Sequence, residues 1–274
     1  MYKNTRGYKE WTLDSNSFIN EFKKKCLIFD IESTSVKFYS QQDEDKYIIQ
    51  YLLKDKINDG TYLEIGACDG KFYSNTKTLE DFFNFSGILI EPQELFFNNI
   101  KNNRSMNKNE LYNCAVTNSD SDYITFIGNN GEAGVLNTIN TDLNKKNWTN
   151  SYNVKNRKMK DILKNSKFKY IDFMIIDVEG GELELLKSID FSFPIFCIII
   201  EAHSNQQEKN KIFGNYLKNN GFTFRERQRG NEVWINHNYF RKHLFNYDDI
   251  IENTYENEKV FNIDINSNLQ FKLV

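Results

Sequence analysis

Short apolar runs alternate with amphipathic segments along the middle of the chain. An apolar run bounded by turn residues is typical of a buried strand, and spacings of three or four positions are typical of a helix. By these patterns we expect strands at Thr61–Ile65, Gly87–Ile90, Leu111–Val116, Ile171–Val178 and Ile195–Glu201. We expect helices at Thr76–Asn84, Pro92–Asn102, Arg157–Lys164, Glu182–Ile189 and Gln206–Asn220. This alternation predicts a parallel sheet with helices on both faces.

Other segments add strands outside this alternation. Tyr123–Ile127 alternates in polarity and predicts an extra strand, and residues 128–153, rich in Gly, Asn and Thr, predict a long loop. Phe222–Glu226 and Glu232–Asn236 predict an antiparallel pair across a turn at Arg229–Asn231. We therefore expect a mostly parallel sheet with antiparallel character at one edge.

The length of 274 residues suits one enlarged α/β domain better than two full domains. We place that domain at residues 59–237, because the alternating strands and helices lie there. Residues 1–58 are expected to form an N-terminal helical extension, with a helix over 43–57. For residues 238–274 the pattern defines a C-terminal extension but not its structure.

Composition and charge narrow the class of protein. A hydrophobic content of 39% argues against a wholly disordered chain, and a net charge of −3 argues against general nucleic-acid binding. The longest apolar run, near Ile195–Ile200, is too short to span a bilayer, and residues 1–4 do not begin a signal sequence. None of the four cysteines has CxxC spacing, which argues against a structural zinc site. We expect a soluble, cytoplasmic protein with free buried thiols.

The turn after the first expected strand is the first candidate for ligand binding, because ligands of such sheets lie at the carboxyl ends of the strands. Gly66 and Gly70 permit tight turns and a close approach to the backbone. The turn does not match GxGxxG, since position 71 is Lys. Glu64 and Asp69 disfavour a polyphosphate and favour a ligand with a cationic centre. The alternative is a plain strand–turn–helix connection.

Glu91 follows the second strand by one position and lies about 25 residues beyond the glycine turn. At that offset a carboxylate can accept both hydroxyl groups of a ribose. Pro92 starts the next helix directly behind it, so the alternative is an acid that only stabilises a helix N-terminus. Ala115, at the end of the third strand, leaves room for a flat ring.

The fourth and fifth strands are followed by further polar residues. Asp177, Glu179 and Glu182 surround two glycines after the fourth strand, and His203 follows the fifth strand. His203 is a candidate general base, since histidine has the side chain whose unperturbed pKa lies nearest neutrality. Helix capping remains the alternative for Glu179 and Glu182.

Several of these segments together resemble a known family. They are Ser40–Asp45, the GTYLEIGACDG turn at 60–70, Ser74–Thr76 with Leu79–Glu80, GILIEP at 87–92, IDFMIIDVEGGELELL at 171–186 and IIEAH at 199–203. In this combination the chain resembles FkbM-type S-adenosylmethionine-dependent methyltransferases. The resemblance implies a class I methyltransferase fold with strand order 3-2-1-4-5-7-6. It also implies methyl transfer to an oxygen, commonly a hydroxyl of a sugar or a natural product.

With this resemblance, S-adenosylmethionine is the expected cofactor. The expected cofactor-binding residues are Glu64, Gly66, Ala67, Asp69, Ser74, Asn75, Glu91, Pro92, Ala115 and Asp177. We expect Glu64 and Asp69 to suit the sulfonium and amino groups, Glu91 to hold the ribose, and Ala115 to border adenine. Ser74 and Asn75 are expected to meet the carboxylate of the cofactor or the turn itself. His203 is the first choice for the general base, with Asp177 and Glu179 as competitors.

Other ligands and functions are compatible with the same residues. A divalent metal with Asp177, Glu179, Glu201 and His203 as ligands is not favoured, and no metal-binding residue is assigned. The loop at 128–153 is expected to cover the acceptor, with Trp148 or Tyr152 as a stacking surface for a sugar. The expected partner is a small molecule or glycan, without nucleic acid or membrane, and a homo-oligomer stays open. A non-catalytic binding module, an NAD-dependent oxidoreductase and a nucleic-acid methyltransferase are the other functions considered.

Overall fold

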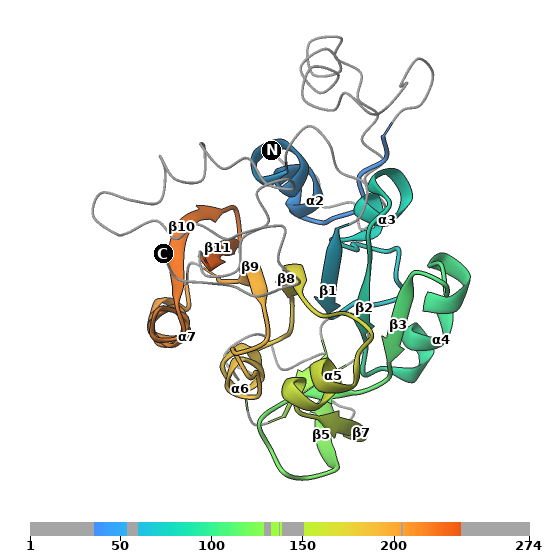
Figure 1. Ribbon diagram of the computed structural model, residues 1–274. Coiled ribbons are helices and arrows are strands. Elements are labelled where there is room, and N and C mark those ends of the chain that lie inside the picture. The colour runs from blue at the N-terminus through green and yellow to red at the C-terminus, as the bar shows by residue number, and fades with distance from the viewer. Residues whose placement is uncertain are drawn as a thin grey trace, which may run out of the picture.

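The computed structural model describes residues 36–53, 60–128, 133–136, 138, 151–203 and 205–236. Most of the expected N-terminal extension lies outside the described residues, as do Trp148 and the expected C-terminal extension at 238–274. Figure 1 shows the described part as a central sheet with helices packed on both sides.

Seven strands form the central sheet in the order β10-β11-β9-β8-β1-β2-β3. Their bounds are Thr61–Ile65 (β1), Ser86–Ile90 (β2), Asn109–Tyr112 (β3), Ile171–Ile176 (β8), Ile195–Glu201 (β9), Phe222–Gln228 (β10) and Asn231–Asn236 (β11). Strands β3, β2, β1, β8 and β9 are parallel, whereas β11 is antiparallel to both β9 and β10. The expected order 3-2-1-4-5-7-6 is thus confirmed, and so is the antiparallel edge.

The two faces of this sheet carry separate apolar cores. Along β1 the side chain of Tyr62 belongs to one core and that of Leu63 to the other, as the two-residue period of a strand requires. The helices are Lys77–Phe83 (α3), Glu94–Asn103 (α4), Met159–Asn165 (α5), Glu182–Lys187 (α6) and Gln207–Asn219 (α7). Helices α3 and α4 contribute to the first core, and α5, α6 and α7 to the second. Because both faces are covered, β8 and β9 can be apolar along almost their whole length.

The part of the N-terminal segment that is described belongs to the domain. A helix over Glu44–Tyr47 (α2) continues as the π-helix Ile48–Leu52 (η1), which confirms the helix expected at 43–57 as far as Leu52. Ile48 and Leu52 are fully buried in the first core. Gln42 also binds the β10–β11 turn, where its side-chain oxygen accepts the backbone N–H of Gly230 at 2.8 Å.

One predicted strand is wrong as a single element. Leu111–Val116 is divided into β3, in the central sheet, and Ala115–Val116 (β4), which pairs with Ser151–Arg157 (β7) in a second sheet. Asn113 stands at the break, and its Nδ2 donates to the carbonyls of Glu91 and Pro92 at 2.9 and 3.2 Å. These bonds hold the chain at the carboxyl edge of the central sheet and so end β3 there.

The second sheet also corrects the long loop expected at 128–153. Its order is β4-β7-β5-β6, where β5 is the expected strand Tyr123–Ile127 and β6 is Gly134–Val135. Strands β6 and β7 therefore occupy the two ends of the expected loop, because each pairs with β5. Tyr152 lies in β7, so it stands on a strand and not in a loop.

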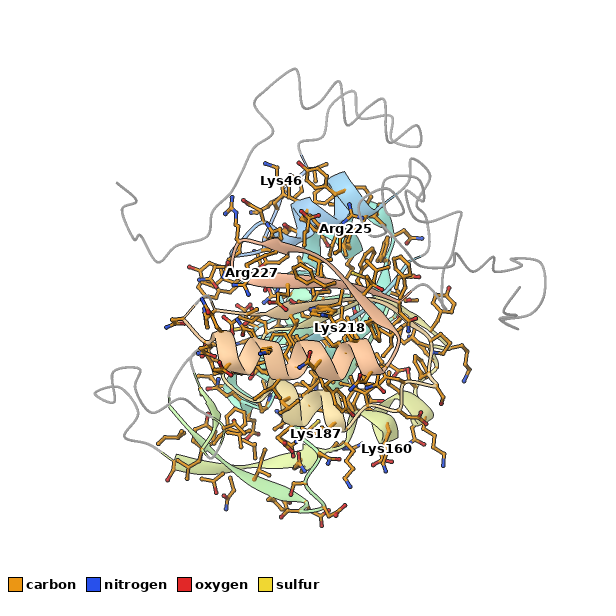
Figure 2. All side chains as sticks on the ribbon, turned by 90° about the vertical axis from the view of Figure 1, so that its left-hand side faces the viewer. Lys46, Lys160, Lys187, Lys218, Arg225 and Arg227 are labelled. Atoms are coloured by element: carbon orange, nitrogen blue, oxygen red, sulfur yellow. The ribbon has the colours of Figure 1, made fainter. Side chains whose placement is uncertain are left out.

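Basic side chains are spread over the face shown in Figure 2, from Lys46 to Arg225 and Lys160. Among the labelled side chains, Lys187 pairs with Glu184 at 2.8 Å, Arg225 with Glu226 at 3.1 Å and Arg227 with Glu232 at 2.7 Å. The absence of a nucleic-acid partner stays a prediction. Within the described part of the chain, no helix is long and apolar enough to cross a membrane.

Candidate active site

The turn after β1 is joined to both neighbouring strands. The backbone N–H groups of Gly66 and Ala67 donate to the carbonyl of Ile90 at 3.1 Å, and that of Asp177 donates to Ile65 at 3.1 Å. Gly66 has a φ of +87°, and a Cβ there would lie 2.0 Å from the carbonyl oxygen of Asp177. Only glycine fits at this position. The carboxyl ends of β1, β2 and β8 therefore meet at a residue where no side chain covers the backbone.

Gly66→Ala is expected to lower the free energy of unfolding by about 2 kcal/mol or more, because the new methyl group meets backbone and φ is positive. Urea denaturation of the purified variant measures this. Gly181→Ala is the matched control, since its φ is −89° and its added Cβ would meet no atom nearer than 3.9 Å. We expect the control to lose less than about 1 kcal/mol. Equal losses in the two variants would contradict the steric argument.

Glu91 lies beside this turn at the end of β2, and only 4% of it is exposed. Its Oε2 accepts the backbone N–H of Cys68 at 2.9 Å, and its Oε1 accepts that of Gln93 at 2.8 Å. Each oxygen keeps capacity for a further hydrogen bond. Burial outweighs these two bonds and raises the pKa of Glu91 to about 7.

Glu64, in β1, binds groups of the protein's own chain. Its carboxylate is buried and accepts from Ser74 Oγ at 3.0 Å, from the N–H of Asn75 at 2.7 Å and from Thr76 Oγ1 at 2.5 Å. Glu64 therefore holds the Ser74–Thr76 segment from inside the protein. A direct effect of its charge on a bound cation stays a prediction.

The other residues expected around the cofactor lie at the same edge. Asp69 Oδ1 accepts the backbone N–H groups of Lys71 and Phe72, at 2.9 and 2.6 Å, and so shapes the turn. Asn75 is 4% exposed, and its side-chain oxygen is buried without a hydrogen-bond partner. An orphaned buried acceptor of this kind fits a ligand that brings an N–H or O–H group.

Ala115 and Tyr152 belong to one apolar cluster in the second sheet. The Tyr152 hydroxyl is buried without a hydrogen-bond partner. Burial raises its pKa, and the negative charge of Glu91 adds to the rise. This charge effect indicates that Tyr152 lies toward the Glu91 end of the edge.

A group of carboxylates lies beyond β8 and β9. Burial first, and then the charges of Glu44 and Glu179, raise the pKa of Asp177 to about 7. Burial, and then the charge of Asp177, raise the pKa of Glu201 to about 9. Glu182 stands in the first turn of α6 and pairs with Lys209 Nζ at 2.6 Å, which agrees with a helix-terminal role for this residue.

His203 comes two residues after Glu201, and its side chain is 41% exposed. Its Nε2 lies 3.0 Å from Oε1 of Glu201. The carboxylate can thus orient the ring and leave Nδ1 for a second partner, which is the arrangement of a general base with an orienting group.

Over the described ranges, no three His, Cys, Asp or Glu side chains are arranged to hold a metal ion, so Asp177, Glu179, Glu201 and His203 are not gathered in that way.

These raised pKa values predict a pH dependence of stability. A carboxyl group whose folded pKa is raised stabilises the fold fully below its unfolded pKa, near 4, and this contribution is lost as the pH rises through the folded pKa. For Glu91 and Asp177 that loss begins above about pH 4 and is complete above about pH 7, whereas for Glu201 it continues to about pH 9. We expect the free energy of unfolding to fall by about 1 to 3 kcal/mol between pH 6 and pH 8, in urea titrations of the ligand-free protein. A stability that is constant or rises over this range would contradict the burial of these groups.

Two residues at this edge, Arg104 and Glu44, were not among the predicted site residues. Arg104, directly after α4, is buried and donates to Ser74 Oγ at 2.9 Å. Glu44, from the N-terminal segment, adds its charge to that around Asp177. A basic residue at the end of a helix is a common surface pattern, so nothing in the sequence distinguishes Arg104.

The strand order, the glycine turn after β1 and the acidic residue at the end of β2 together define a class I methyltransferase fold. Residues 64–228 match the family model of the methyltransferase FkbM domain. The chain therefore belongs to the FkbM methyltransferase domain family.

Solved structures with a similar fold are distant in sequence. The FkbM methyltransferase of Methylobacillus flagellatus is 14% identical with a TM-score of 0.40, and the match covers 65% of this chain and 43% of that one. TrmK of M. capricolum in complex with S-adenosylhomocysteine is 11% identical with a TM-score of 0.36, covering 65% and 62%. The N-terminal domain of human METTL16 is 13% identical with a TM-score of 0.36, covering 80% and 67%. The chain thus spans less than half of that FkbM protein, and the comparison with curated proteins found no match.

Proposed function

We propose that this protein binds S-adenosylmethionine at the turn after β1 and transfers its methyl group to a hydroxyl of a sugar or a related small molecule. The observation that carries the proposal is Glu91, a buried carboxylate beside the bare Gly66 backbone, with free acceptor capacity on both oxygens. A pair of adjacent hydroxyl groups suits such a carboxylate.

The residues around Glu91 support the same ligand. Glu91 would accept the two ribose hydroxyls, and Gly66 with Ala67 would let the ligand lie against the backbone. The unpartnered oxygen of Asn75 would accept from the amino group of the methionine part. Ala115, with Tyr152 in the same cluster, would border the adenine. Asp69 shapes the turn. Pro92 lies between Glu91 and α4, which begins at Glu94 and not at Pro92 as expected.

When bound, S-adenosylmethionine supplies a methyl group on a positively charged sulfur, which an oxygen nucleophile can displace in line. The chain must then orient the acceptor and remove its hydroxyl proton. His203 is the residue proposed for this, with Nδ1 accepting the proton while Glu201 holds Nε2. Asp177 and Glu179 are the competing bases at the same edge.

The charge of this edge bears on the acceptor. The negative charges of Glu179 and Glu182 add to the effect of burial in raising the pKa values of Asp177 and Glu201. A cluster of carboxyl groups, protonated or ionised, binds hydroxyl and amino groups more favourably than phosphate, so an uncharged or amino-bearing sugar suits it better than a nucleotide sugar.

The proposal is tested in two stages. Calorimetry with S-adenosylmethionine, S-adenosylhomocysteine and NAD identifies the cofactor, and binding of NAD alone would contradict the proposal. A panel of neutral, amino and phosphorylated sugars is then incubated with labelled methyl donor. We expect label in a neutral or amino sugar at a hydroxyl oxygen. Cofactor binding without transfer to any acceptor, in the panel or in cell extract, would favour a non-catalytic binding module.

A further inference from the structure

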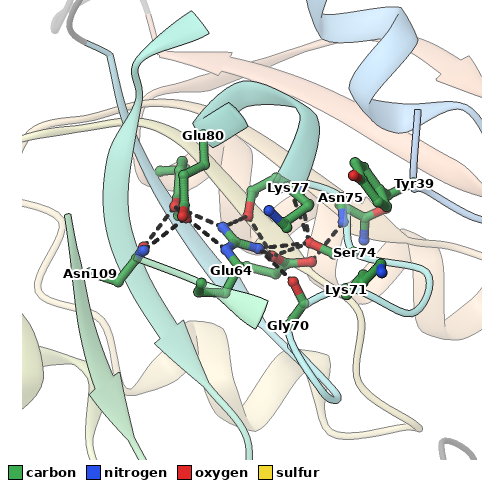
Figure 3. A network of polar contacts seen from close by, with 12 residues as sticks. Tyr39, Glu64, Gly70, Lys71, Ser74, Asn75, Lys77, Glu80 and Asn109 are labelled. Carbon is green, nitrogen blue, oxygen red and sulfur yellow. Dashed lines mark hydrogen bonds and ion pairs between the residues drawn. The ribbon is translucent and has the colours of Figure 1, made fainter. Parts of the chain in front are cut away.

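Arg104 lies under the turn at the proposed cofactor site, at the end of α4, and its side chain is fully buried. All five of its N–H donors have acceptors. These are Glu80 Oε2 (2.7 Å), Gly70 O (3.1 Å), Ser74 Oγ (2.9 Å), Tyr62 OH (2.7 Å) and Thr76 Oγ1 (2.8 Å). Its guanidinium also lies 3.6 Å from the carboxylate of Glu64. Figure 3 shows this network, with Glu64, Gly70, Ser74 and Glu80 around its centre.

The contacts of Arg104 fall into two groups. Tyr62 and Glu80 belong to the scaffold, in β1 and α3, and they are also joined to each other at 2.7 Å. Gly70, Ser74 and Thr76 belong to the connection between β1 and α3, which carries Asn75. Arg104 therefore links a rigid part of the fold to the segment that would meet the cofactor.

The turn is also shaped to receive this side chain. Gly70 has a φ of +78°, and a Cβ there would lie 2.9 Å from Cγ of Arg104. The glycine thus leaves the space in which the guanidinium reaches the carbonyl of residue 70. Lysine cannot replace it fully, because only the planar guanidinium directs five donors at fixed angles.

We propose that Arg104 is a positioning residue for the cofactor: it holds Gly70 and the Ser74–Thr76 segment against Glu64, so that Asn75 and the turn have the shape the ligand needs. The inference rests on the proposed function. Since Arg104 is fully buried, it acts through the turn and not by contact with a ligand.

Two variants test this. Arg104→Lys keeps the charge but loses most of the directed donors, and Thr76→Val removes only one hydroxyl, which joins Arg104 to Glu64. Asp172→Asn is the matched control. It disturbs the carboxylate that accepts the N–H and hydroxyl of Thr61, at 2.7 and 3.0 Å, at the amino end of the same strand β1.

The measurements are the melting temperature, the dissociation constant of S-adenosylhomocysteine by calorimetry, and hydrogen exchange of the ligand-free protein. We expect Arg104→Lys to raise the dissociation constant at least about tenfold and Thr76→Val several-fold, since small displacements of a binding segment are costly. The backbone N–H of Asn75, bonded to Glu64 at 2.7 Å, should exchange faster in both variants. The control should lower the melting temperature and leave the dissociation constant within twofold.

Dissociation constants within twofold of wild type in both variants would overturn the positioning role, and so would unchanged exchange at Asn75. An equal loss of affinity in Asp172→Asn would mean that Arg104 affects binding only through the general stability of the fold. If Arg104→Lys does not fold, the affinity and exchange of Thr76→Val decide whether the positioning role holds. Failure of wild-type protein to bind S-adenosylmethionine or S-adenosylhomocysteine would instead count against the proposed function.

Discussion

Glu91→Ala is expected to raise the dissociation constant of S-adenosylhomocysteine by about 100-fold or more. Hydrogen bonds to a charged group contribute about 1.5 to 3 kcal/mol each, and two ribose hydroxyls would be lost together. Calorimetry on the purified variant measures the effect. Glu110→Ala is the matched control, because Glu110 stands on the adjacent strand β3 and its Oε1 binds the N–H of Lys167, away from the turn.

Wild-type affinity should also depend on pH through the same residue. Hydroxyl donors favour the ionised carboxylate, whose pKa in the free protein is raised to about 7 by burial. Binding should therefore release protons near neutrality, and affinity should fall as the pH is lowered from 8 to 6. Titrations in buffers of different ionisation enthalpy detect the proton release. If the dissociation constant of Glu91→Ala lies within fivefold of wild type, Glu91 is not part of the binding site.

The sequence predicted the parts of the fold that depend on local pattern. The strand Ile195–Glu201 has the predicted bounds, because an unbroken apolar run between turns has few alternatives when both faces are covered. The split of Leu111–Val116 could not be predicted in this way. It depends on Asn113 binding the carbonyls of Glu91 and Pro92, which are 22 and 21 residues away in the chain.

The residues of the candidate site likewise differ in whether local sequence pattern or long-range contacts determine them. Gly66, Glu91 and His203 could be placed because each follows a predicted strand, and parallel strands end at one edge. The role of Glu64 could not be predicted, because the sequence does not show whether a carboxylate in a strand faces a ligand or its own chain. Arg104 depends on five acceptors brought together from β1, α3 and the turn between them.

His203→Ala is expected to lower kcat for methyl transfer by a factor of about 100 to 10,000, the usual contribution of a general base. The dissociation constant of S-adenosylhomocysteine should stay within threefold, because the ring binds Glu201 and not the turn after β1. The assay uses the acceptor identified by the labelled screen. Glu201→Gln is expected to cause a smaller loss, since the amide oxygen can still accept a hydrogen bond from Nε2 and hold the ring in place.

The competing base predicts a different pattern, and this distinguishes the two. If Asp177 accepts the proton, Asp177→Asn should abolish turnover while His203→Ala keeps it. Burial and carboxylate neighbours raise the pKa of Asp177 to about 7, a value that also suits a base at neutral pH, so the two variants and not the pKa distinguish the candidates. The backbone N–H of Asp177 donates to the carbonyl of Ile65 at the end of β1, which favours a structural role for the residue. Full turnover in His203→Ala across the pH range would show that His203 is not the base.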